Sequence, residues 1–65
     1  MTRRTISTLT RIADLLEDIE QDYSERASYF EREGKDSAAR WNHRMHDRVQ
    51  KAMERLEALL DEDDD

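Results

Sequence analysis

The stretch "REGKDSAA", residues 32–39, contains the only glycine of the chain, Gly34, and the chain has no proline. Glycine adopts the left-handed backbone conformation with little steric cost, which suits it to the position after the end of a helix. Asp36 or Ser37 can accept hydrogen bonds from the free amides at the start of a following helix. The stretch therefore predicts a helix that ends at 33, a turn at 34–36 and a second helix from 37.

Apolar side chains on both sides of this turn recur at spacings of three and four residues, which is typical of amphipathic helices. No stretch shows the strict alternation of a strand. The sequence thus predicts an all-α fold, a single antiparallel two-helix hairpin with helices at about 6–33 and 37–60. The stripe before the turn consists of Ile6, Leu9, Ala13, Leu16, Tyr23, Ala27 and Phe30, and the stripe after it of Ala38, Trp41, Met45, Val49, Ala52, Met53, Leu56, Leu59 and Leu60.

The end of the hairpin away from the turn carries more apolar side chains than two helices can cover. Ile12, Leu15 and Ile19 widen the first stripe there, and Met53, Leu59 and Leu60 widen the second. So small a chain buries only about 60% of the surface of its unfolded form, and without cysteine it has no disulfide to stabilise it. We therefore expect a homodimer that forms a four-helix bundle, although helices of another protein would cover the same stripes. The expected dimer core is Leu9, Ile12, Leu16, Ile19, Val49, Met53, Leu56 and Leu60.

Charged residues make up 43% of the chain, and the formal net charge is −6. Bases outnumber acids in residues 1–13 and 34–55, whereas acids outnumber bases in 14–33 and 56–65. Because acids oppose the dipole at the C-terminal end of a helix, the tail 61–65 is predicted to be disordered and solvated. The longest apolar runs are far shorter than the roughly 20 residues that a membrane span needs, so we expect a soluble, cytoplasmic protein without membrane contact.

His43, His46 and Asp47 have the spacing that brings three potential metal ligands to one side of a helix. The helical phase directs His43 and Asp47 toward solvent, and the opposing level of the first helix holds an arginine, Arg26, which repels a cation. We therefore predict no metal centre and no cofactor, although metal binding by these three residues stays open. Catalysis needs a concave, water-excluding pocket, which two helices do not supply, so the chain is not expected to be an enzyme.

Five basic residues follow one another along the second helix at steps of three or four and form what we call the basic ridge. Arginine pairs with phosphate or carboxylate in a fixed fork, and aromatic residues near the turn add side chains of the kind that concentrate binding energy. The ridge consists of Arg40, Arg44, Arg48, Lys51 and Arg55. The candidate binding residues are Tyr29, Arg40, Trp41, Arg44 and Arg48.

Glu20 is an acid on an otherwise apolar stripe, at the level of Arg44 and Arg48 when the chain folds back at Gly34. A half-buried ion pair with one of these arginines would fix the register of the two helices. The level and the charge together make this pair a hypothesis that the fold can test.

These features favour a non-enzymatic protein–protein interaction module or small regulatory adaptor, a homodimer that binds an unidentified protein. A less favoured alternative is a nucleic-acid-binding regulator that uses the basic ridge. Another is an acidic inhibitor of the phage or plasmid type, in which Asp14, Asp18, Glu25 and the tail imitate the phosphates of DNA. In general shape and length the hairpin resembles the RNA-binding copy-number regulators of plasmids, but no motif can be aligned, so the resemblance assigns no functional residue.

Overall fold

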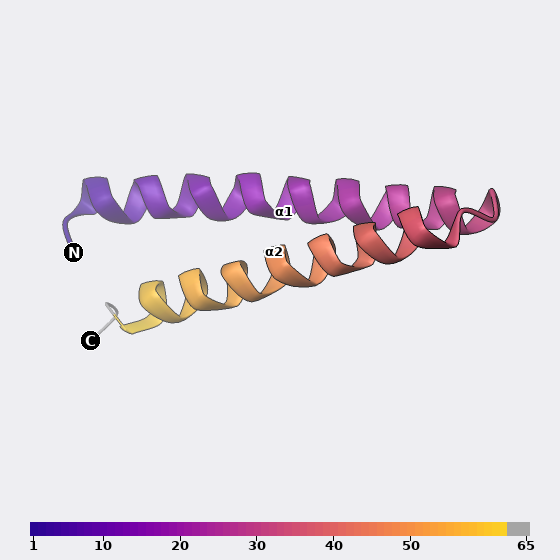
Figure 1. The fold of residues 1–65 in the computed structure, drawn as a ribbon. Coiled ribbons are helices and arrows are strands. Elements are labelled where there is room, and N and C mark those ends of the chain that lie inside the picture. The colour runs from indigo at the N-terminus through magenta and orange to yellow at the C-terminus, as the bar shows by residue number, and fades with distance from the viewer. Residues whose placement is uncertain (63–65) are drawn as a thin grey trace.

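The structure, a computed structural model, describes residues 1–62 and consists of two long helices, α1 (Arg3–Arg32) and α2 (Asp36–Glu62). The helices run antiparallel and pack against each other (Figure 1). This arrangement confirms the all-α fold and the two-helix hairpin, and the described residues contain no strand. The hairpin measures 48 × 15 × 11 Å. No helix in residues 1–62 is apolar over a length that could cross a membrane.

The turn between the helices is built around Gly34, which has a φ of 73°. The Gly34 amide donates a hydrogen bond to the Glu31 carbonyl at 3.1 Å, and the Lys35 amide donates one to the Phe30 carbonyl at 2.9 Å. This pair of bonds is the Schellman motif, which satisfies the last free carbonyls of a helix when the next residue is left-handed. Gly34 therefore ends α1 and reverses the chain.

The observed helix ends differ from the expected ones by a few residues. Helix α1 begins at Arg3, three residues before Ile6, because the hydroxyl of Thr2 accepts a hydrogen bond from the Thr5 amide at 3.2 Å and caps the helix. Helix α2 begins one residue earlier than expected, with Asp36 in its first turn, where an acid interacts favourably with the helix dipole. Of the acidic tail expected to be disordered, Asp61 and Glu62 belong to α2, and 63–65 lie outside the described residues.

The seam between the helices changes in character along the hairpin. In the half next to the turn (residues 21–48, the turn half), Ala27, Ala39 and Asn42 are buried, and such short side chains let the helices approach closely. In the half that carries the termini (residues 1–20 and 49–62, the open half), only Leu56 is buried among the described residues. Figure 1 shows the helices diverging toward this end. The larger side chains on the open seam, Leu9, Leu16, Val49, Met53 and Leu60, stay partly exposed.

Candidate functional site

The residues expected to form the dimer core fall into two groups in the structure. Six of them lie on the seam between α1 and α2, where they are partly or fully buried within a single hairpin: Leu9, Leu16, Val49, Met53, Leu56 and Leu60. Ile12 and Ile19 lie beside the seam and are each 41% exposed. The side chains that one hairpin leaves uncovered are therefore different from most of those named from the sequence.

Five large apolar side chains are exposed along one side of the hairpin. Helical phase rotates these side chains away from the seam in the same direction on both helices. In an antiparallel pair, residues that are rotated from the seam in the same direction lie on the same side of the pair. Their exposed fractions lie between 41% and 61%. We call this surface the apolar face, and it consists of Ile12, Leu15 and Ile19 on α1 with Trp41 and Leu59 on α2.

Trp41 is part of an aromatic cluster at the turn half of the apolar face. Its ring lies edge-on to the ring of Tyr23, with the centroids 6.0 Å apart. The guanidinium of Arg26 lies 5.9 Å from the centroid of Tyr23, within the range of a cation–π contact. The sequence places Tyr23 on the first apolar stripe and Arg26 at the level of His43, but the spacing of residues does not predict that both join Trp41 in one cluster.

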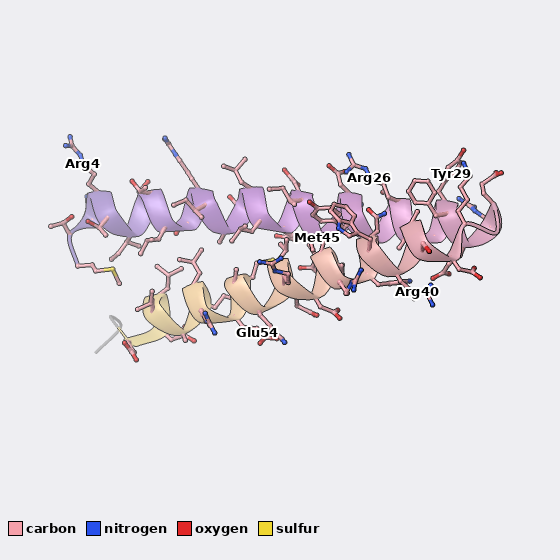
Figure 2. The ribbon with its side chains drawn as sticks, viewed as in Figure 1. Arg4, Arg26, Tyr29, Arg40, Met45 and Glu54 are labelled. Atoms are coloured by element: carbon pink, nitrogen blue, oxygen red, sulfur yellow. The ribbon has the colours of Figure 1, made fainter. Side chains whose placement is uncertain are left out.

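Tyr29 does not join this cluster. Its ring packs edge-on against Phe30, with centroids 5.4 Å apart, and half of its surface is exposed. Figure 2 shows Tyr29 on the side of α1 away from α2, and Arg40 on the side of α2 away from α1. The five candidate binding residues therefore do not form one contiguous site.

The basic ridge is exposed along its whole length. Among residues 1–62, no Lys or Arg side chain forms an ion pair with an Asp or Glu side chain. The side-chain ion pairs in this range are made by His43 and His46. On α1, the exposed acids Asp14, Asp18, Asp22 and Glu25 are likewise without a basic partner. The opposite charges of the two helices lie at matching levels but point away from each other.

The two histidines each contact a different carboxylate of α1. His46 Nε2 lies 3.2 Å from Glu20 Oε1, with both side chains about three-quarters buried, and His46 Nδ1 lies 3.6 Å from Asp47 Oδ1. His43 Nε2 donates a hydrogen bond to Glu31 Oε1, and both of these side chains are more than half exposed. Within the part of the chain that the structure describes, no three His, Asp or Glu residues converge to hold a metal ion.

Glu20 lies on the seam as the sequence indicates, with most of its side chain buried, but the structure corrects its partner. His46 points toward the seam from α2 and meets Glu20, whereas Arg44 and Arg48 lie on the outward-facing ridge. The contact thus joins the helices near the middle of the hairpin, where the turn half meets the open half.

No pocket is found on residues 1–62. The chain matches no protein-family model, no curated protein sequence and no solved structure. The features of the hairpin that could bind another molecule are the apolar face, the aromatic cluster, the basic ridge and the exposed acids of α1.

Proposed function

We propose that this chain is a non-enzymatic protein–protein interaction module that works as a homodimer, in which two hairpins associate through their apolar faces into a four-helix bundle. The observation that carries the proposal is the apolar face itself. Large exposed apolar patches on small proteins mark interaction surfaces, and burying such area stabilises association by about 25 cal/mol per Å². A second copy covers the apolar face of the first with an identical surface, as in most closed dimers.

The accessible surface of the hairpin supports the same proposal. It amounts to 5367 Å², whereas a compact monomer of this mass exposes about 4,400 Å². The excess, about 1,000 Å², is comparable to the roughly 800 Å² that each partner buries in an interface of standard size. Pairing of two hairpins would bring the exposed surface per chain close to that of a compact protein.

Residues outside the apolar face remain for a different protein partner. Tyr29 and Arg40 lie on the outer sides of the two helices near the turn (Figure 2). Tyrosine and arginine are enriched among residues that dominate binding energy. In this proposal the dimer presents two copies of that surface to an unidentified protein.

Sedimentation equilibrium at roughly tens of micromolar tests the homodimer. The wild-type chain should sediment at twice its mass of 7.8 kDa. Leu15→Glu should sediment as a monomer of unchanged helicity, because Leu15 is 61% exposed in the hairpin and its replacement buries a charge only in the dimer. The matched control is Gln50→Glu, which introduces the same charge at an exposed position of α2 outside the apolar face and should leave the dimer intact. A monomeric wild type, or a Leu15→Glu variant of unchanged mass, would contradict the proposal.

Nucleic-acid binding is the second candidate function, because the basic ridge has no acidic partner within residues 1–62. Proteins that neutralise phosphates lose affinity steeply as salt rises. Retention of the wild type on heparin at low salt, abolished in Arg44→Glu/Arg48→Glu, would support this function. Absence of retention at low salt would exclude it.

A further inference from the structure

We infer that, in the homodimer proposed above, α1 of each copy lies along α2 of the other, about a two-fold axis parallel to the helices. Both turns then lie at the same end of the bundle. This inference rests on the proposed function, since it specifies how the second copy covers the apolar face. The charges that border the apolar face determine the arrangement.

On α1, the apolar face is bordered on its outer side by Asp18 and Asp22, which we call the acidic edge. On α2, it is bordered by three members of the basic ridge, Arg48, Lys51 and Arg55, which we call the basic edge. All five side chains are exposed, and none makes an ion pair within residues 1–62. By helical phase each edge is turned away from the seam, so the two edges of one hairpin cannot reach each other.

The edges lie at matching levels along the hairpin. Counting outward from the turn, Asp18 lies at the level of Lys51, and Asp22 lies close to the level of Arg48. Toward the open end the signs reverse: the same side of α1 carries the bases Arg4 and Arg11, and α2 carries the acid Glu62 at a level between them. Figure 2 shows Arg4 pointing away from α2, so it too is turned from the helix that carries its counterpart.

Two symmetric arrangements can stack one apolar face on another. With the two-fold axis parallel to the helices, α1 meets the α2 of the second copy at unchanged levels, and acidic edges meet basic edges on both sides of the bundle. With the axis perpendicular to the helices, α1 meets the α1 of the second copy, and the two run in opposite directions. Asp18, near the midpoint of the hairpin, then faces its own counterpart, and so does Lys51.

Complementary charges favour the first arrangement and repulsion disfavours the second. Juxtaposed like charges weaken an interface and select against wrong pairings, whereas opposite charges fix the register. The side chains left without an ion pair in one hairpin therefore find partners on the neighbouring one. The parallel axis is the arrangement in which the acidic edge of each copy meets the basic edge of the other.

Distances between spin labels decide between the two arrangements. The chain has no cysteine, so Lys35→Cys places one label per copy in the turn. Since packed helix axes lie about 8–10 Å apart, labels at the same end should be on the order of 20 Å apart. Labels at opposite ends would approach the 48 Å length of the hairpin. A short distance supports the inference and a long one overturns it.

A second label position separates failure of the arrangement from failure of the homodimer. Gln50 lies close to the midpoint of the hairpin, so labels at Gln50→Cys are separated by the thickness of the bundle, and not by its length, in either arrangement. Coupling at Gln50→Cys with a long distance at Lys35→Cys overturns the arrangement and leaves the homodimer intact. No coupling at either position, together with a monomeric mass, overturns both.

Charge reversal gives an independent test. Asp18→Lys/Asp22→Lys should raise the dissociation constant of the dimer by about tenfold or more, because it replaces attraction between the edges by repulsion on both sides of the bundle. Combining these changes with Arg48→Glu/Lys51→Glu exchanges the edges and should restore the dissociation constant to near the wild-type value. An unchanged dissociation constant in the first variant, or no restoration in the combined one, would overturn the inference.

Discussion

The turn half and the open half of this hairpin are built from the same two helices but differ in how completely they cover their apolar side chains. In the turn half, Ala27, Ala39 and Asn42 are buried, and the helices lie close together. In the open half, Leu56 is the one buried residue among those described, while Leu15 and Leu59 are more than half exposed. Small side chains thus let the two helices close the seam of the turn half, where Trp41 is the one member of the apolar face, whereas large ones separate the helices and leave a surface that needs a further helix.

The polar contacts differ in the same way. In the described residues, the polar side-chain contacts between the helices are made by His43 and His46. They contact Glu31 and Glu20 of α1, in or beside the turn half. Farther out, the exposed acids of α1 and the bases of α2 point away from each other. Where the helices diverge, no ion pair joins α1 to α2 within residues 1–62 of one hairpin.

The largest expected effect comes from enlarging a buried alanine of the turn half. Ala27 has no exposed surface, so Ala27→Leu forces the helices apart and should lower the free energy of unfolding by about 2 kcal/mol. The matched substitution in the open half is Ala13→Leu, on the seam of α1 where the helices diverge. It should change the free energy of unfolding by less than about 0.5 kcal/mol. Urea unfolding measures both, and an equal loss in the two variants would remove the distinction between the halves.

A smaller effect is expected at the turn that joins the two helices. The φ of Gly34 is 73°, and a Cβ added there would contact nothing within 4 Å. Gly34→Ala should therefore lower the free energy of unfolding by about 1 kcal/mol through backbone strain alone. Gly34→Asn should cost less, because asparagine tolerates the left-handed conformation. If the alanine variant unfolds at the wild-type urea concentration, the turn is not strained by a side chain.

The smallest effect, and one of opposite sign, is expected at Asn42. Its Nδ2 donates to the Ala38 carbonyl at 2.8 Å, but its buried Oδ1 has no hydrogen-bond partner among residues 1–62. Because an unsatisfied buried acceptor is destabilising, Asn42→Leu should raise the free energy of unfolding by about 0.5–1 kcal/mol. The control is Gln50→Leu, which replaces an exposed polar residue of the same helix and should not raise the free energy of unfolding. A loss of stability in Asn42→Leu would mean that the amide contributes more than its hydrogen bonds indicate.

The fold could be predicted from the sequence because two independent signals agree. The lone Gly34 marks the reversal, and apolar side chains at spacings of three and four mark a helix on each side. Apolar periodicity predicts a start near Ile6, whereas α1 begins at Arg3, because the Thr2 hydroxyl caps it there. Caps depend on one hydrogen bond, which the pattern of apolar residues does not report.

The surface was harder to predict than the fold. Periodicity indicates which apolar side chains share one face of a helix, but the separation of the helices decides which of them the hairpin covers. Leu9 and Met53 therefore lie on the seam, while Leu15 and Leu59 lie on the apolar face. The partner of Glu20 was assigned by level and charge to an arginine, but the direction of each side chain around α2 brings His46 to it instead.

The close packing beside Gly34 also bears on the order in which the chain folds. Contacts across the turn half join residues that are near in sequence, so forming them closes short loops and loses little chain entropy. Contacts across the open half join residues progressively farther apart in the chain, and they become favourable only when the turn half has already brought the helices together. Folding should therefore start at the turn and proceed toward the termini, at the high rates typical of proteins dominated by local contacts. The surface that two copies would share is then completed last, so each hairpin folds before it associates.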